Sequence, residues 1–142
     1  MNTVSYLLKL KGNNVISVSP DMMVREVLLI MSEKNIGAII VTENEKLVGI
    51  FSERDYARKI VLKDKSSKTT PIREVMSSDL VTVKPGTSID DCMVLMTERH
   101  IRHLPVIDND QLVGVISIGD LVKHIIEDQK MTIENLKHYI TS

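Results

Sequence analysis

The sequence LVGIFSERDY at residues 47–56 returns as LVGVISIGDL at residues 112–121. Each stretch begins with Leu-Val-Gly, continues through two apolar residues to a Ser, and reaches an Asp three residues after that Ser. A shift of 65 residues aligns the two copies without a gap, and residues 15–61 then match residues 80–126 at 13 of 47 positions. Most other apolar positions exchange one aliphatic residue for another. The chain therefore contains an internal duplication, and each unit is expected to need a neighbour to bury its apolar face.

The composition is that of an ordinary globular protein. Of the 142 residues, 43% are hydrophobic and 26% are charged, and the net charge is −1, which gives no general attraction to nucleic acid or to anionic membranes. Aromatic residues make up 3%, too few for the stacking platforms of single-strand binders. No apolar run approaches the roughly 20 residues of a membrane helix, and the N-terminus lacks the pattern of a secretory signal. A single cysteine, Cys92, suits a reducing compartment, so we expect a cytoplasmic protein.

Each copy predicts the element order β–α–β–β–α. A short β-branched strand, at 15–18 or 80–83, is followed by a Pro and then by a helical apolar pattern. Two strands then flank a polar turn, and the Ser after them opens a second helix. These strands are expected at 38–42 and 47–51 and at 104–108 and 112–116, and the second helices at 53–62 and 118–127. The fold class is therefore α+β, of an α/β type, with the two repeats packed face to face about an approximate two-fold axis.

Start signals place a further short helix before each repeat. Thr70 is expected as the N-cap of one, with Pro71 at its first helical position, and Ser5 as the N-cap of the other. Residues 62–70 are polar and basic, which predicts an exposed linker. We therefore divide the chain into a first repeat at 3–65, a second repeat at 71–128 and a tail at 129–142. The tail is expected to form a short helix with an apolar stripe for packing or dimerisation, made of Met131, Ile133, Leu136 and Ile140.

The repeated Ser-x-x-Asp at 52–55 and 117–120 has two interpretations. In the first it is a capping box, in which the Ser accepts a backbone N–H and the Asp reaches back. In the second, the same helix start offers free N–H groups and a positive dipole end to an anion. The Asp would then accept hydrogen bonds from two ribose hydroxyls, and the Ser would contact phosphate. Gly49 and Gly114 predict a close approach to the strand backbone.

The duplication, the two Ser-x-x-Asp segments and ERHIRHLPVID at 98–108 resemble a tandem pair of cystathionine-β-synthase-type (CBS) domains, the Bateman module. The resemblance covers essentially the whole chain outside the tail. Members of that family bind adenine nucleosides and nucleotides between the two copies. It therefore implies a free-standing, non-enzymatic regulatory module that senses an adenine ligand. AMP is the first ligand that it implies, and NAD(H), ADP, ATP and S-adenosylmethionine are alternatives that the sequence does not rank.

The resemblance implies sites to which both copies contribute. The Asp and Ser of one copy hold the ribose and phosphate, and the first two strands of the other copy enclose the adenine. One site would then consist of Ser52, Asp55, Val81, Ile101, Arg102 and His103. The other would consist of Ser117, Asp120, Ile16, Ile36, Gly37 and Ala38.

The two sites are expected to differ in charge. Arg54 and, through the resemblance, Arg102 and His103 would neutralise a phosphate at the first site, so we expect AMP there. Gly119 leaves more room at the second site, which is expected to take the nucleoside part of a larger ligand, such as a dinucleotide. Phe51 is bulkier than its counterpart in the other copy and is expected to narrow one mouth of the cleft.

Other functions have weaker support. Cys92 lies on an apolar helix face, which favours core packing over a nucleophile, and His100 and His103 have no further zinc ligands near them in sequence. No Gly-rich phosphate loop occurs, so we expect no catalytic activity, no catalytic cofactor and no metal. The alternative function is a ligand-free dimeric scaffold that docks an unknown protein partner. A homodimer fits both functions, and loss of ligand binding on removal of Asp55 or Asp120 separates them.

Overall fold

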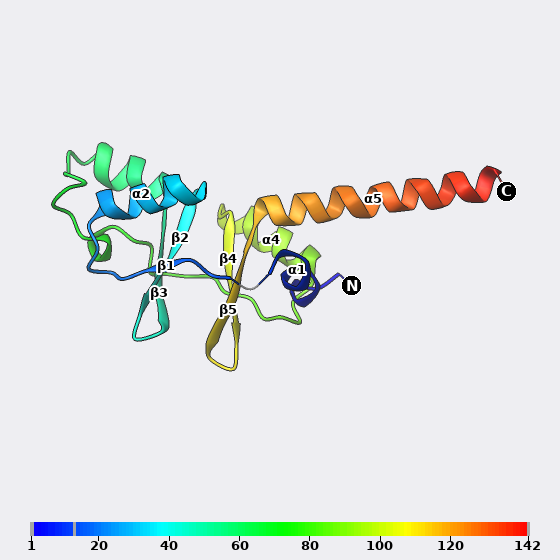
Figure 1. Cartoon of the computed structure of the whole chain (residues 1–142), viewed down its shortest axis with the longest axis horizontal. Helices are drawn as coiled ribbons and strands as arrows, with labels where there is room; N and C mark the ends of the chain where they lie inside the picture. Colours follow the sequence, from blue (N-terminus) through cyan, green and yellow to red (C-terminus); the bar gives the residue numbers. More distant parts are fainter. Residues whose placement is uncertain (1, 13, 142) are drawn as a thin grey trace. The chain divides into compact units, whose positions relative to one another are not determined.

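A computed structural model describes residues 2–12 and 14–141 of the chain. The chain divides into two compact units (Figure 1). We call Asn14–Val81 the central unit, and Met1–Asn13 with Thr82–Ser142 the terminal unit. Each unit holds one copy of the duplicated sequence as helices on a small sheet, which confirms the α+β class. Face-to-face packing of the two repeats stays a prediction.

The central unit is built on a three-stranded sheet of order β1-β2-β3. β1 runs parallel to β2, and β2 pairs antiparallel with β3. Its elements are β1 (Ser17–Val18), α2 (Val24–Lys34), β2 (Ala38–Glu43), β3 (Lys46–Ser52), α3 (Glu53–Asp55), the π-helix η1 (Tyr56–Val61) and the 3-10 helix η2 (Ile72–Glu74). The second helix expected at 53–62 is thus one short α-helical turn followed by a π-helix.

The terminal unit has a two-stranded antiparallel sheet of β4 and β5. Its elements are α1 (Val4–Lys11), α4 (Ile89–Arg99), β4 (His103–Asp108), β5 (Gln111–Ser117) and α5 (Ile118–Thr141). The strand expected at 80–83 is reduced to one parallel bridge, between Val83 and Val106. The bridge uses Val83 N–H to Pro105 O and Ile107 N–H to Val83 O. The next rung toward residue 81 would need an N–H from Pro105, which proline lacks.

The helix starts differ from their predicted positions. α1 begins at Val4 with Thr3 as its N-cap, so Ser5 lies inside the helix and the expected Ser5 cap is wrong. Pro71, in extended conformation, is the N-cap of η2, and Thr70 is not. The reason lies one residue earlier, because the Thr70 carbonyl accepts the N–H of Val24 and holds the chain extended there.

The tail is not a separate helix. α5 continues from Ile118 to Thr141 in one piece, whereas we expected a helix at 118–127 followed by a second short one. The segment holds no Pro and no Gly after Gly119, so nothing in it terminates a helix.

The segment that precedes each repeat packs on the other repeat. α1, expected with the first repeat, lies in the terminal unit, while η2 lies in the central unit. Equivalent hydrogen bonds dock both segments, from Val4 N–H to Thr87 O and from Ile72 N–H to Met22 O. The boundaries 3–65 and 71–128 follow the order of the sequence, whereas this packing depends on contacts between distant residues.

The strand glycines give these segments room. A Cβ at Gly49 would lie 2.5 Å from Met76 Sδ, and one at Gly114 would lie 2.6 Å from Leu8 Cδ2. The close approach expected at both glycines is thus made by side chains of the protein itself. Each side chain comes from the segment that precedes the other repeat.

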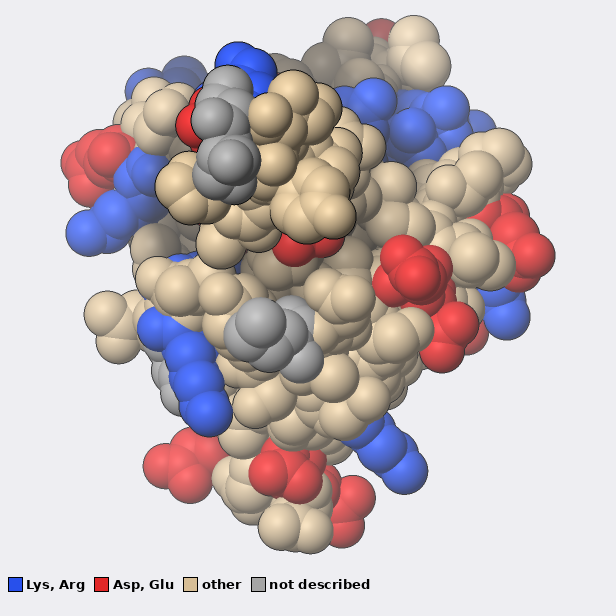
Figure 2. All heavy atoms as spheres, turned by 90° about the vertical axis from the view of Figure 1, so that its right-hand side faces the viewer, with Lys and Arg blue, Asp and Glu red and all other residues tan. Residues whose placement is uncertain are grey.

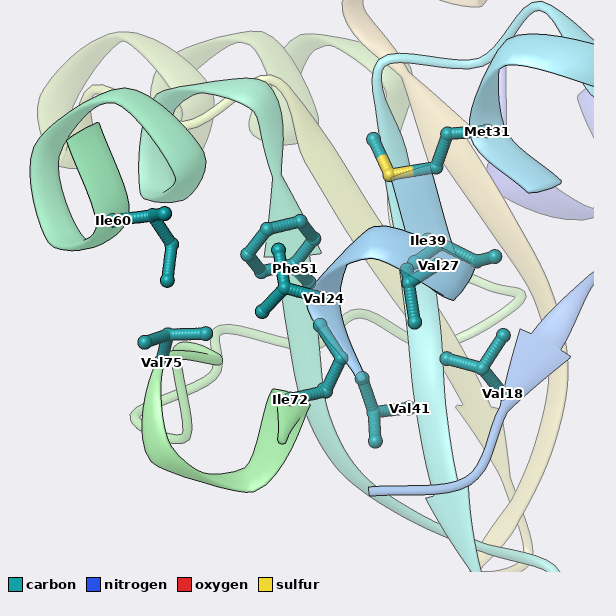
Figure 3. Close-up of a cluster of buried hydrophobic side chains, with 10 residues drawn as sticks. All are labelled: Val18, Val24, Val27, Met31, Ile39, Val41, Phe51, Ile60, Ile72 and Val75. Carbon is teal, nitrogen blue, oxygen red and sulfur yellow. The ribbon is translucent and has the colours of Figure 1, made fainter. Parts of the chain in front are cut away.

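The core of the central unit includes residues of η2 as well as of the repeat (Figure 3). Its buried side chains are Val18, Val24, Val27, Met31, Ile39, Val41, Phe51, Ile60, Ile72 and Val75. Phe51 is 0% exposed. The expectation that Phe51 narrows the mouth of a cleft is therefore wrong, because the alternation of β3 directs its ring into the core.

Gly49→Ala is expected to lower the free energy of unfolding by about 1–3 kcal/mol, as overpacking does. The new methyl group would meet Met76 Sδ at 2.5 Å and the Ser77 carbonyl oxygen at 3.1 Å. Gly86→Ala is the matched control, because a Cβ there meets nothing within 4 Å, and its effect should stay within about 0.5 kcal/mol. Urea denaturation measures both. Adding Met76→Ala to Gly49→Ala should recover part of the loss, and the absence of such coupling would contradict this contact.

Candidate ligand-binding site

The two Ser-x-x-Asp segments adopt the same geometry at the end of the hairpin in each unit. Ser52 Oγ accepts the Asp55 N–H at 3.2 Å, and Asp55 Oδ2 accepts the Ser52 N–H at 3.0 Å. In the terminal unit, Ser117 Oγ accepts the Asp120 N–H at 3.1 Å, and Asp120 Oδ2 accepts the Ser117 N–H at 2.8 Å. The capping-box interpretation is thus confirmed in both copies. A capping box occupies only part of an Asp carboxylate, so its remaining contacts decide what else the residue can do.

Asp55 is enclosed by its own unit. The residue is 7% exposed, and its Oδ1 accepts the hydroxyl of Ser77 at 3.1 Å and pairs with Lys59 Nζ at 3.1 Å. Lys59 also donates to the carbonyl of Val75. Both carboxylate oxygens of Asp55 are therefore engaged, one in the capping box and one with residues of η1 and of the segment after η2.

Asp120 is more open and has a different partner. Its side chain is 26% exposed, and Lys11 Nζ lies 2.5 Å from Oδ2. Lys11, at the end of α1, also donates to the Val115 carbonyl at 2.7 Å. Asp120 Oδ2 accepts hydrogen bonds from the Lys11 ammonium and from the Ser117 N–H. The Asp120 carboxylate is thus partly exposed, and it pairs with the ammonium group of Lys11, which a ligand could replace.

The start of β4 lies beside the Asp120 turn. His103 pairs with Ser117 in the sheet register, and the Arg102 carbonyl accepts the Ile118 N–H at 2.9 Å. The central unit repeats this arrangement, since Ala38 pairs with Ser52. Within each unit, the residue at the start of the first hairpin strand, β2 or β4, therefore lies beside the Ser-x-x-Asp of the same repeat.

Two pKa shifts follow from this environment. Burial alone would raise the pKa of Asp120, but the hydrogen bonds from Lys11 and Ser117 outweigh it and hold the pKa below its usual value. Burial lowers the pKa of His103, and the positive charges of Lys11 and Arg102 add to this effect while Asp120 opposes it. At neutral pH the carboxylate of Asp120 is therefore ionised and the imidazole of His103 is neutral.

The central unit carries a hollow of about 610 Å³ beside its own Ser-x-x-Asp turn. Its lining residues are Leu28, Met31, Ser32, Asn35, Ile36, Gly37, Glu53 and Tyr56. The volume lies in the range of small-molecule pockets. Glu53 packs directly on Gly37, where its Oε1 lies 3.2 Å from the place of a Cβ. The hollow thus presents a carboxylate where the terminal unit has Ile118 at the equivalent position.

The structure places the predicted site residues in two groups. Ser52, Arg54, Asp55, Val81, Ile16, Ile36, Gly37 and Ala38 lie in the central unit, and Ser117, Gly119, Asp120, Ile101, Arg102 and His103 lie in the terminal unit. Arg102 and His103, expected to serve Asp55 across the repeats, adjoin Asp120 in their own unit. Sites shared between the repeats stay a prediction.

Sequence reasoning missed Lys11, Lys59 and Ser77. The spacing of Asp55 and Lys59, four residues apart on one helix, is a known ion-pair signal and could have indicated that contact. Lys11 and Asp120 are separated by 109 residues. No local pattern joins them, because the contact depends on α1 packing in the terminal unit.

Lowering the pH from 7.5 to 5.5 is expected to reduce the free energy of unfolding, partly through His103. The pKa of His103 lies below its ordinary 6.5 in the folded protein, so the unfolded chain takes up the proton first as the pH falls. One such proton contributes at most about 1.4 kcal/mol per pH unit. Asp120 does not act in this window, because its pKa lies below 3.8. Urea denaturation should show a shallower pH dependence for His103→Asn, and an unchanged one would contradict this assignment.

The structure agrees with a packing role for Cys92. The residue is 0% exposed, and burial raises the pKa of its thiol to about 11, with the charge of Asp91 adding to the shift. A nucleophilic thiol needs the opposite shift. Across residues 2–12 and 14–141, no group of three or more His, Cys, Asp or Glu side chains is arranged to hold a metal ion.

Comparison with known proteins identifies the fold. The CBS-domain family model matches residues 10–62 and 72–127, which correspond to the two repeats. The chain belongs to the CBS-domain family. It is therefore a CBS pair, a regulatory module with one CBS repeat in each unit.

Proteins of this family from different sources resemble the chain over most of its length. The mitochondrial CBS domain-containing protein CBSX3 of Arabidopsis thaliana is 35% identical and covers 97% of this chain, which spans 71% of that protein. A solved protein with CBS domains from Burkholderia ambifaria is 46% identical, with a TM-score of 0.86, over 89% of this chain and 96% of that one. The CBS pair of MJ0100, solved with 5′-methylthioadenosine and S-adenosylmethionine, has a TM-score of 0.78 over 89% of this chain and 97% of that one. At 22% identity, the last likeness shows the fold alone.

Two properties of the described residues concern charge and membrane spanning. Both acidic and basic side chains occur on the face shown in Figure 2. Among the described residues, none of the helices has the length and apolar character needed to cross a membrane.

Proposed function

We propose that this CBS pair is a non-enzymatic sensor of adenine nucleotides, with AMP as the ligand of the Asp120 turn. The geometry of Asp120 carries the proposal: a half-buried carboxylate at a helix start, beside Lys11 and the Arg102–His103 pair. A ribose diol can replace the ammonium of Lys11 on the carboxylate. The released ammonium group, together with Arg102, would then neutralise the phosphate.

This proposal reverses the ligand preference expected from the sequence. The side chain of Asp55 is 10% exposed and holds Ser77 and Lys59, whereas the side chain of Asp120 is 26% exposed. The hollow beside the Asp55 turn is lined by Glu53, whose carboxylate repels a phosphate. A nucleoside without phosphate, or with a cationic group, suits that hollow better.

The ligand class is supported by the family and by the residues together. The CBS pair of MJ0100 holds two adenosine compounds, and the Ser-x-x-Asp turns of this chain offer the groups that a ribose requires. We propose a homodimer as the functional state, and hexameric CBS proteins of the same fold are solved. A cytoplasmic location remains a prediction, since the Arabidopsis relative is described as mitochondrial.

A thermal-unfolding panel on refolded, nucleotide-free protein tests the proposal. AMP, ADP, ATP, NAD, NADH and S-adenosylmethionine are compared, each far above its expected dissociation constant. A ligand at about 100 times that constant adds roughly 2.7 kcal/mol, which raises Tm by about 5–10 °C in a domain of this size. A shift with AMP is expected, whereas flat curves for every ligand would favour the ligand-free scaffold.

Lys11→Met distinguishes the proposed ribose contact of Asp120 from the proposed phosphate contact of Lys11. The substitution frees the Asp120 carboxylate but removes a phosphate contact, so adenosine should bind at least as well as to the wild type. AMP should bind about 10-fold more weakly, the effect of one lost charge-assisted hydrogen bond. Equal losses for adenosine and AMP would show that Lys11 only supports the fold.

A further inference from the structure

The last half of α5 lies outside the fold of its own unit. The helix extends beyond β4, β5 and α4 (Figure 1), and every residue from Ile126 to Ile140 is exposed. Among residues 118–140, the buried and half-buried ones lie between Ile118 and Ile125, where the helix packs on α1, α4 and β5. A helical extension of about 15 residues is marginal in water without a packing partner.

Exposed apolar residues of α5 recur at alternating intervals of four and three. We call this row of residues, together with the polar Gln129 that lies in it, the seam. It consists of Val122, Ile126, Gln129, Ile133, Leu136 and Ile140. The exposed fractions of its apolar members are 43% for Val122, 48% for Ile126, 51% for Ile133, 56% for Leu136 and 80% for Ile140. This spacing is that of the a and d positions of a coiled coil. Met131, although 66% exposed, lies on the other side of the helix and outside the seam.

We propose that the seam is covered by α5 of a second copy of this chain, in a parallel two-stranded coiled coil. The a positions are then Ile126, Ile133 and Ile140, and the d positions are Val122, Gln129 and Leu136. Isoleucine at a with leucine at d, the combination at Ile133 and Leu136, favours two parallel strands over higher assemblies. Gln129 is the one polar residue at a seam position, where a polar pair fixes the register of the two helices.

Charge beside the seam selects the parallel orientation. The e positions are Lys123, Lys130 and Lys137. In an antiparallel pair the e positions of the two helices face each other, so these lysines would repel. In a parallel pair each e position faces a g position of the partner helix, so Lys130 faces Ile125 and Lys137 faces Thr132. The lysine stems can then cover the seam while their ammonium groups reach water.

Disulfide formation by a cysteine placed in the seam tests the proposal on the full chain. Leu136→Cys puts identical thiols opposite each other in a parallel pair, at an effective concentration on the order of millimolar. Met131→Cys is the matched control, exposed on the same helix but pointing away. The native Cys92 is buried, with its pKa raised to about 11, so it should contribute little background.

Mild oxidation at about 10 μM protein should link Leu136→Cys roughly 100-fold faster than Met131→Cys. Equal rates would overturn the proposal. An antiparallel pair with full overlap would hold the position-136 thiols about 15 Å apart, so a dimer that fails to link would overturn the parallel arrangement. As a second measurement, Ile133→Asp with Leu136→Asp should reduce helical circular dichroism and weaken dimerisation at least 10-fold. If the helical circular dichroism and the dimer affinity both stay unchanged while the native fold is kept, the seam is not the dimer interface and the proposal is overturned.

Discussion

Phe51→Ala is expected to lower the free energy of unfolding by about 3–5 kcal/mol, as other deletions of buried aromatic rings do. Phe51 is 0% exposed in the core of the central unit, a cluster whose other members come from several elements, including β1, α2, β2 and η2 (Figure 3). Loss of the ring removes apolar burial and leaves a cavity whose walls belong to several elements, so it cannot collapse easily. Because the total stability of a domain is only 5–15 kcal/mol, the variant should be close to the limit of folding at 37 °C.

Leu29→Ala on α2 is the control, because Leu29 belongs to the same unit but is 55% exposed. Its effect should stay below about 1 kcal/mol. Urea denaturation at one temperature measures both variants. Similar losses for the two variants would mean that β3 does not direct Phe51 into a well-packed core.

Asp120→Asn is expected to weaken AMP binding about 10- to 100-fold, the loss of one or two hydrogen bonds to a charged group. The amide keeps the size of the carboxylate and can still accept the Ser117 N–H, but it attracts neither Lys11 nor a ribose diol as strongly. The free energy of unfolding should change less, because Lys11 and Asp120 form a partly exposed ion pair, and such pairs contribute only about 0–1 kcal/mol.

Asp55→Asn provides the contrast. Asp55 is buried among Ser52, Ser77 and Lys59, so the substitution should lower the stability of the central unit. AMP affinity at the Asp120 turn should remain within about twofold of the wild type, because the changed contacts lie in the other unit. If Asp55→Asn weakened AMP binding more than Asp120→Asn did, the original assignment of AMP to Asp55 would be favoured.

The duplication made most of the architecture predictable. A shift of 65 residues superimposes the hairpin strands, α2 on α4 and the capping boxes, because most positions in a repeat share their apolar or polar character with their counterpart. The departures also have local causes. Pro105 occupies the place of Ile40 and shortens the strand pairing at Val83, and the absence of a helix breaker after Gly119 lets α5 continue to Thr141.

The environment of the two carboxylates could not be predicted in this way. Asp55 and Asp120 occupy equivalent positions, yet their partners come from segments outside the aligned repeats. Ser77 follows η2, and Lys11 ends α1. Both contacts depend on the packing of each preceding segment on the other repeat. The periodicity of the sequence does not indicate that α1 packs on the second repeat or that the η2 segment packs on the first.

Isothermal titration calorimetry with AMP tests the central claim most directly. Wild-type protein, Asp120→Asn and Asp55→Asn are titrated under identical conditions, after nucleotide has been removed and native circular dichroism confirmed. Saturable AMP binding to the wild type, weakened about 10- to 100-fold by Asp120→Asn alone, is the expected result. No AMP binding to the wild type, or equal binding to Asp120→Asn, would contradict the proposal that the Asp120 turn is the nucleotide site.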